Sequence, residues 1–212
     1  MDKLDFIYKR RSVRNFLDAD VPADDLREIL KAAVYAPSGK NMQNWHFVVV
    51  KNKAKIAEMA QIVERKNAEL AELLPSEEKR KAFRGMVAYH TVFKKAPVVI
   101  LVYAGPYPTL ATDLAEAKAA PLDLIHALAR PNPGVQNIAA AMENLLLAAA
   151  NLGYGTCWMT GPTYAAEEIS KLVGFAKPGY YLAALTPLGV PADNNGTNPP
   201  RKPLDEVVTF VD

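Results

Sequence analysis

The stretch VQNIAAAMENLLLAAANLGYGTCW, residues 135–158, decides how the rest of the chain is arranged. Within residues 135–152 five positions are polar, and they are Gln136, Asn137, Glu143, Asn144 and Asn151. A helix with apolar side chains in almost every direction is a buried helix. Its apolar runs are far shorter than the roughly 20 residues that a membrane span needs. The pattern therefore predicts a core helix of a soluble fold, which passes through Gly153 and Gly155 into a strand.

Alanines crowd two parts of this helix, residues 139–141 and 148–150. Small side chains allow a second helix to approach closely, and two partners fit the pattern. One is the core of the same chain, and the other is the same helix of a second copy. We predict the second arrangement, a homodimer packed on this helix.

The length and charge of the chain limit the functions that it can have. A chain of 212 residues fits one domain, which at this size buries roughly 70% of its unfolded surface. The 25 Lys and Arg residues nearly balance 23 Asp and Glu, so the charge gives no reason to expect nucleic acid or an anionic membrane as a partner. The single cysteine, Cys157, excludes an internal disulfide, and residues 1–10 do not resemble a signal peptide. We predict a cytoplasmic protein with small-molecule substrates.

Hydrophobic periodicity predicts an α+β fold, with helices around a small, mainly antiparallel sheet in one domain, residues 1–212. A long connection, residues 104–134, has the length of a lid or cap over a site, and residues 191–212 form a C-terminal arm. Besides the central helix, helices are expected over residues 4–8, over 54–93 with a break at Pro75 and Ser76, and near 165–173. Another helix is expected to begin within residues 21–25 and to end before Pro37. Strands are expected over residues 45–50, 98–102, 156–159 and 180–188.

A basic cluster lies near the N-terminus, where Arg10, Arg11 and Arg14 flank Ser12. Guanidinium groups and a hydroxyl suit a phosphate monoester, because each charge-assisted hydrogen bond contributes about 1.5–3 kcal/mol. The alternative is a solvated basic helix end that favours its own helix dipole.

Residues 36–45, APSGKNMQNW, form a loop rich in amides and hydroxyls directly before a strand. Such a loop offers donors and acceptors to the edge of a heteroaromatic ring. A turn that satisfies its own backbone is the alternative. The Gly39-Lys40 pair is not a nucleotide-binding P-loop, because the earlier glycine and the Ser or Thr after Lys40 are absent.

The elbow at residues 153–156 has two glycines, which would let backbone amides approach a flat ligand. Cys157 is a possible nucleophile by residue type, but a buried small hydrophobic side chain explains it better. His46, His90 and His126 lack the spacing of metal ligands, and no Rossmann glycine motif follows a strand. We predict no metal site and no side-chain nucleophile.

Four segments together resemble the nitroreductase family of FMN-dependent oxidoreductases. They are RRSVRNF at 10–16, APSGKNMQNWHFVVV at 36–50, MENLLLAAANLGYGTCWMTGP at 142–162 and PPRKPLDEVV at 199–208. They occur in the family's order and span almost the whole chain.

The resemblance implies an intertwined homodimer of nitroreductase-like fold, with two FMN sites built from both subunits. On this reading Arg10, Ser12 and Arg14 hold the ribityl phosphate or the pyrimidine end of the flavin, with Arg11 nearby, and Arg201 reaches the phosphate. The loop of the other subunit lines the flavin, and the elbow backbone faces the ring. The implied cofactor-binding residues are Arg10, Arg11, Ser12, Arg14, Pro37, Ser38, Gly39, Asn41, Gln43, Gly155, Thr156, Cys157 and Arg201.

The resemblance also implies a two-stage reaction, in which NAD(P)H passes hydride to flavin N5 and an acceptor such as a nitroaromatic or quinone then takes its place. A flavin-binding redox sensor or store without turnover is the alternative. Three features depart from the family pattern. Asn44 stands where proline is usual, Gly39 stands where a second serine is common, and residues 104–134 have no obvious counterpart.

Overall fold

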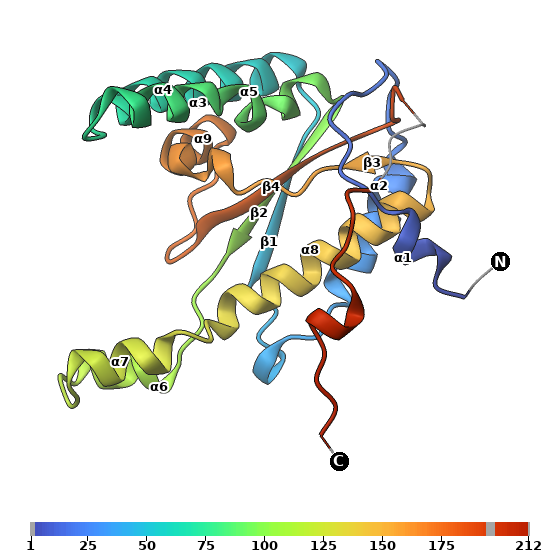
Figure 1. Cartoon of the computed structure of the whole chain (residues 1–212). Helices are drawn as coiled ribbons and strands as arrows, with labels where there is room; N and C mark the ends of the chain where they lie inside the picture. The colour runs from blue at the N-terminus through green and yellow to red at the C-terminus, as the bar shows by residue number, and fades with distance from the viewer. Residues whose placement is uncertain (1–2, 194–197, 212) are drawn as a thin grey trace.

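The fold is built on a four-stranded antiparallel sheet (Figure 1). The computed structural model describes residues 3–193 and 198–211. The strand order is β1-β2-β4-β3, with β1 at Trp45–Val50, β2 at Val98–Ala104, β4 at Tyr181–Gly189 and β3 at Gly155–Thr156. The predicted α+β fold with a small antiparallel sheet is thereby confirmed.

Strand β2 is buried on both faces, as its continuous apolar run predicts. Val98, Ile100 and Val102 pack with α2, Ala23–Val34, and α8, Pro133–Asn151. The alternate residues Val99, Leu101 and Tyr103 pack on the other side with α3, Lys53–Glu72, and α9, Ala166–Val173. Figure 1 shows the sheet between these two helical layers.

The remaining elements mostly follow the predicted boundaries. The chain opens with α1, Asp5–Lys9. After α3 come α4, Glu77–Gly85, and α5, Val87–His90. The Ser76 hydroxyl caps α4 by accepting a hydrogen bond from the Lys79 amide, just after the predicted break. Short 3-10 turns lie at Gly39–Asn41, Val92–Lys95, Gly161–Ala165 and Leu204–Glu206.

One sequence prediction needs correction, and the burial of α8 is partial in a single chain. The strand expected over 156–159 is reduced to β3, because the chain turns after Thr156 and rejoins β4 in a single bridge between Met159 and Leu185. Helix α8 is buried along only one side, including Ile138, Met142 and Leu145. Ala140, Leu147 and Ala148 on α8 stay partly exposed in a single chain.

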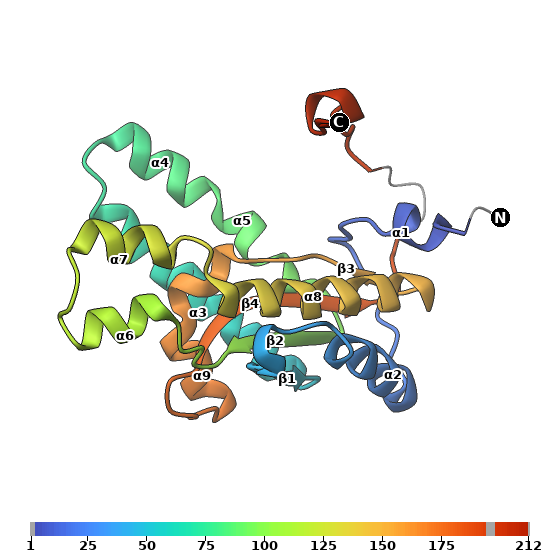
Figure 2. The same cartoon turned by 90° about the horizontal axis from the view of Figure 1, so that it is seen from below.

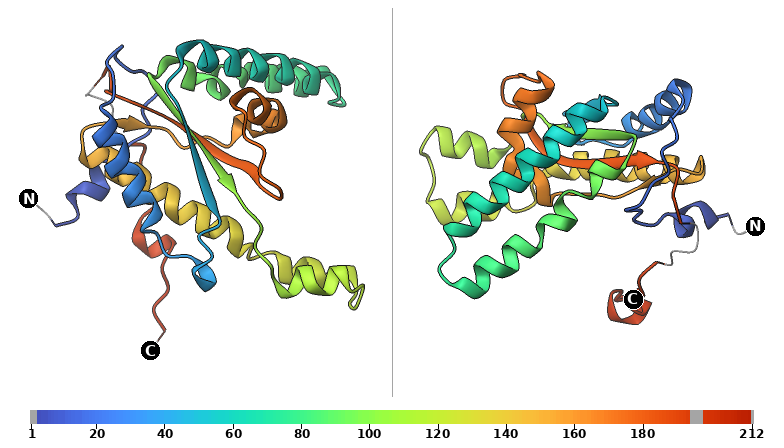
Figure 3. Two further views of the ribbon diagram at one scale, coloured as in Figure 1. Left: turned by 180° about the vertical axis from the view of Figure 1, so that it is seen from behind. Right: turned by 90° about the horizontal axis from the view of Figure 1, so that it is seen from above.

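The long connection is not an irregular loop. It holds two helices, α6 at Leu110–Glu116 and α7 at Leu122–Ala129, which pack on each other and project from the body as a helical hairpin, residues 105–132 (Figures 1 and 3). The C-terminal arm leaves the body near α1, and its residues 198–211 are all exposed (Figure 2). No helix among the described residues has the length and apolarity of a membrane span.

Candidate functional site

The basic cluster of Arg10, Arg11, Ser12 and Arg14 lies against the elbow. The Val13 amide donates to the Thr156 carbonyl at 2.7 Å, and Ser12 forms a parallel bridge with Thr156. Gly155 makes this approach possible, because a Cβ atom there would lie 2.6 Å from the Cβ of Val13. The fold thus brings together two segments that lie about 140 residues apart in the chain, and both segments are ones that the sequence analysis assigned to a flavin.

The electrostatics around Cys157 show how close these groups are. Burial raises the pKa of the Cys157 thiol, whereas the charge of Arg14, a hydrogen bond from Ser12 and the charge of Arg10 lower it. The side chain is 6% exposed. Cys157 is therefore a buried, protonated thiol within reach of the cluster, which agrees with its reading as a small hydrophobic residue rather than a nucleophile.

Two of the cluster's guanidinium groups have capacity for an anion. Arg10 lies 3.9 Å from a Glu143 carboxylate oxygen on α8, a distance beyond hydrogen bonding. Arg14 is exposed and makes no ion pair or hydrogen bond within residues 3–193 and 198–211. Arg11 differs, since it donates to the carbonyl of Asp193.

Arg201 lies on the arm and points back to its own segment, donating to the Pro199 carbonyl at 2.8 Å. The arm is attached beside the basic cluster, because the Asn198 side chain donates to the carbonyls of Tyr8 and Arg10, each at 3.0 Å. Arg201 therefore lies three residues from a contact with Arg10 but does not itself join the cluster in a single chain.

The loop of residues 36–44, here called the amide loop, has an unusual backbone. Lys40, Asn41 and Gln43 all have left-handed φ angles, of 55°, 51° and 44°. A left-handed conformation at a residue other than glycine costs about 1–3 kcal/mol of folding free energy, and it persists only where the surrounding contacts hold it in place. The Ser38 hydroxyl accepts from the Gln43 amide at 3.1 Å, and the Gln43 side chain donates to Asn41 at 3.1 Å. Pro37, Asn41 and Gln43 remain exposed, so the loop presents polar groups outward.

Two buried asparagines hold the amide loop, and the sequence reading assigned neither to the site. Asn137 on α8 accepts from the Gly39 amide at 3.0 Å and donates to the Asn44 side chain at 2.8 Å. The Asn44 side chain in turn donates to the carbonyls of Gly105 and Gly134. A polar residue among apolar helix positions was the available signal for Asn137, since buried amides need partners.

The basic cluster and the amide loop lie at opposite ends of α8. The loop contacts Asn137 near the start of the helix, and the elbow begins just after Asn151. Fourteen residues at about 1.5 Å each separate these points by about 21 Å. Within one chain the predicted site residues other than Arg201 therefore form two groups: Arg10, Arg11, Ser12, Arg14, Gly155, Thr156 and Cys157 in one, and Pro37, Ser38, Gly39, Asn41 and Gln43 in the other. Arg201 lies apart from both, on the C-terminal arm.

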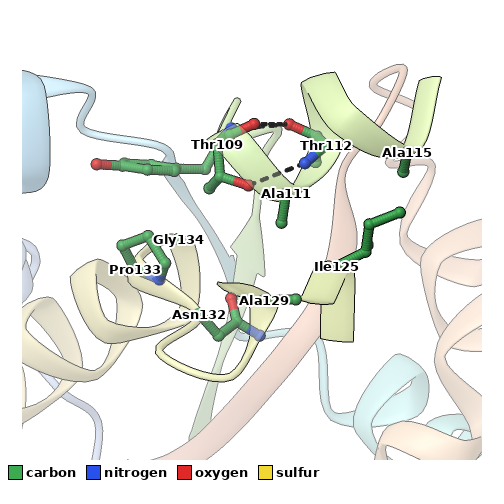
Figure 4. Close-up of a pocket in the computed structure, with 10 residues that line it drawn as sticks. Thr109, Ala111, Thr112, Ala115, Ile125, Ala129, Asn132, Pro133 and Gly134 are labelled. Carbon is green, nitrogen blue, oxygen red and sulfur yellow. Dashed lines mark hydrogen bonds between the residues drawn. The ribbon is translucent and has the colours of Figure 1, made fainter. Parts of the chain in front are cut away.

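A cavity of about 300 Å³ opens between the hairpin and the start of α8 (Figure 4). Ala111, Ile125 and Pro133 line it with apolar surface. Its threonines, Thr109 and Thr112, bond to each other in a capping box, so both hydroxyl groups already have partners in the wall of the cavity. The cavity favours a small apolar group.

Among the described residues no group of three or more His, Cys, Asp or Glu side chains could hold a metal ion. His46 is exposed on the edge strand β1, and His90 is buried in contact with Tyr164.

Comparison with known proteins gives consistent matches over nearly the full length. The sequence model of the Nitroreductase family matches residues 7–190. A Methanothermobacter thermautotrophicus protein, described as a candidate NADH dehydrogenase/NAD(P)H nitroreductase, is 32% identical over 202 residues, or 93% of this chain and 81% of the relative. A BluB-like flavoprotein from Clostridium difficile 630 has a TM-score of 0.91 and 41% identity, covering 100% of both chains. A nitroreductase with bound FMN from Desulfitobacterium hafniense DCB-2 has a TM-score of 0.71 and 26% identity, covering 99% of this chain and 97% of the other.

Proposed function

The chain belongs to the nitroreductase family, and on that premise we propose that it is an FMN-dependent oxidoreductase that works as a homodimer. When bound, FMN would supply the atom that takes hydride from NAD(P)H and returns it to a nitroaromatic, quinone or related small acceptor in a ping-pong reaction. The flavin-containing relatives support the choice of cofactor. The meeting of the basic cluster with the glycine elbow is the observation that carries the proposal.

The residues of the cluster fit a flavin phosphate or the electron-rich edge of the flavin ring. Arg10 and Arg14 bring positive charge without a short ion pair of their own, and Ser12 brings a hydroxyl to the same place. Charge-assisted bonds from such groups favour the anionic form of a ligand. Gly155 and Thr156 bring backbone close to the cluster, where a side chain at position 155 would fill the space.

A second copy would complete the site. The amide loop of the same chain lies at the far end of α8 from the cluster, so it does not complete the same site in one chain. If two copies pack their α8 helices in opposite directions, the loop of one copy comes beside the elbow of the other. The partly exposed side of α8 supports this packing, because Ala32, Leu147 and Ala148 with Phe6 line an open apolar groove.

Stopped-flow absorbance of the purified, FMN-loaded protein tests turnover. Mixing with NADH or NADPH should bleach the bound flavin, and an added quinone should restore its colour. Bound flavin that neither nicotinamide bleaches would favour the redox sensor instead. Protein that binds no FMN would contradict both readings.

Two substitutions test the assignment of the site. Arg10→Ala and Arg201→Ala should each weaken FMN binding roughly tenfold to a hundredfold, the loss of one charge-assisted contact. Arg27→Ala is the matched control, because Arg27 is an exposed arginine on α2 paired with Asp24. Unchanged FMN content in both site variants after dialysis would place the phosphate elsewhere.

A further inference from the structure

Asn44, Gly39 and the helical hairpin meet at one place in the fold. The hairpin helices are flanked by two segments, residues 105–109 and 131–135, here called the outgoing and returning stems. Asn44 is bonded to both stems, because it donates to the carbonyls of Gly105 and Gly134, at 3.1 and 3.3 Å. The backbone carbonyl of Asn44 also accepts from the Gly105 amide at 2.6 Å. One buried residue before β1 thus fixes the point where the chain leaves β2 and the point where it enters α8.

Gly39 is matched to the hairpin in the same way. A Cβ atom at Gly39 would lie 2.3 Å from the hydroxyl oxygen of Tyr107, which lies in the outgoing stem. Lys40 also reaches this stem, because its ammonium group donates to the Pro108 carbonyl at 3.3 Å and lies 5.7 Å from the Tyr107 ring centre. The serine usual at position 39 would compete with Tyr107 for the same space.

Asn137 connects the Gly39 end of the amide loop to Asn44. Its side-chain oxygen accepts from the Gly39 amide, and its amide group donates to Asn44. The hydrogen bonds therefore run without a gap from the amide loop through Asn137 and Asn44 to the hairpin stems. No buried side-chain oxygen or nitrogen in the described part of the chain lacks a partner. In a fully satisfied buried network, a shift at one end leaves groups unpaired at the other.

We propose that Asn44 and Asn137 form a positioning relay, which makes the conformation of the amide loop and the placement of the hairpin one cooperative unit. The relay has no predicted contact with FMN. It acts through the amide loop, which the proposed function assigns to the flavin of the partner copy, and the inference rests on that function. Because the cavity beside Tyr107 lies between the stems, a group that enters it and moves them also changes the amide loop.

Amide hydrogen exchange on the whole chain tests the relay without any substitution. FMN should slow exchange in residues 36–44 and, to a similar degree, in both stems, residues 105–109 and 131–135. Slower exchange in the loop with unchanged stems would overturn the proposal. If the protein binds no FMN, the proposed function fails, and the variants below still test the relay in the free protein.

Asn44→Ala and Asn137→Ala break the relay at two points. Each should raise exchange about tenfold or more in the loop and in both stems, the effect of losing one or more hydrogen bonds. The double variant should add little to the larger single effect, since both remove one network. Additive effects, or loop and stems that respond separately, would show two independent contacts and no relay.

Asn67→Ala is the matched control. Asn67 is a buried asparagine on α3 that donates to the Phe83 carbonyl at 3.0 Å and lies outside both the relay and the groove beside α8. FMN affinity shows whether the relay residues position the amide loop or only stabilise the fold. Asn44→Ala and Asn137→Ala should weaken FMN binding about tenfold. The control should leave FMN binding unchanged even if its melting temperature falls by a comparable amount. Equal FMN affinity in all three variants would make Asn44 structural only. Asn137→Ala keeps the test open if Asn44→Ala fails to fold, because alanine suits a helix interior.

Discussion

The contact between Gly155 and Val13 allows a quantitative test of how the basic cluster is held. In Gly155→Ala the new methyl group would lie 2.6 Å from the Cβ of Val13 and 2.7 Å from both of its Cγ atoms. Comfortable carbon contacts are about 3.5–4.0 Å, so the N-terminal segment has to move by about 1 Å. Such overpacking typically costs about 1–3 kcal/mol.

The displacement also strains the hydrogen bond from the Val13 amide to the Thr156 carbonyl, which contributes about 0.5–1.5 kcal/mol. The two terms together predict a loss of about 1.5–4.5 kcal/mol in unfolding free energy. At about 2–4 °C per kcal/mol for a chain of this size, the melting temperature should fall by roughly 3–18 °C. FMN affinity should fall at least about tenfold, because the arginines move with Val13.

Differential scanning calorimetry and a fluorescence titration with FMN measure the two effects. Gly85→Ala is the matched control, because a Cβ at Gly85 meets no heavy atom within 4 Å at the end of α4. The reasoning is refuted if Gly155→Ala melts no lower than the control and binds FMN as tightly as the native protein.

Three further predictions follow from single contacts. The Tyr154 hydroxyl donates to Asp25 at 2.5 Å, and this hydrogen bond is the largest cause that raises the Tyr154 pKa from 10.0 to about 12. Because the Tyr154 pKa is higher in the folded state, the hydrogen bond stabilises the fold fully below pH 10, and this stabilisation is lost as the pH rises through 12. Urea unfolding should therefore show a steeper loss of stability over that range in the native protein than in Tyr154→Phe, and parallel curves would contradict this origin. Cys157, a buried thiol with a raised pKa, should resist iodoacetamide at pH 8 in the native state and react fully in urea, as mass spectrometry can measure. Leu147→Glu, in the apolar groove beside α8, should give a monomer in size-exclusion chromatography with weak FMN binding, because it places a charge in the proposed interface. Leu73→Glu, at an exposed helix end, should have neither effect. A Leu147→Glu dimer that retains FMN would exclude this interface.

Much of the fold could be predicted because local patterns decide it. The short apolar run of β1, the longer one of β2 and the cap at Ser76 are properties of adjacent residues, and their boundaries agree with the structure to within a few residues. The hairpin helices were missed. Residues 104–134 hold five prolines that mark breaks, and the short helices between them bury few residues to produce a periodic pattern.

The sequence by itself determined the composition of the site: arginines around Ser12, an amide-rich loop before β1, and a glycine elbow after an apolar helix. Residue type and order along the chain suffice for that. Only the tertiary structure decided which of these groups meet. The β3–β4 pairing brings Val13 to Thr156, whereas the length of α8 holds the amide loop about 21 Å away. It also decided that Asn44, Asn137 and the hairpin stems share one network. Such contacts join residues some 30 to 140 positions apart, and no local pattern in the chain encodes them, because they depend on how buried polar groups find partners once the layers have packed.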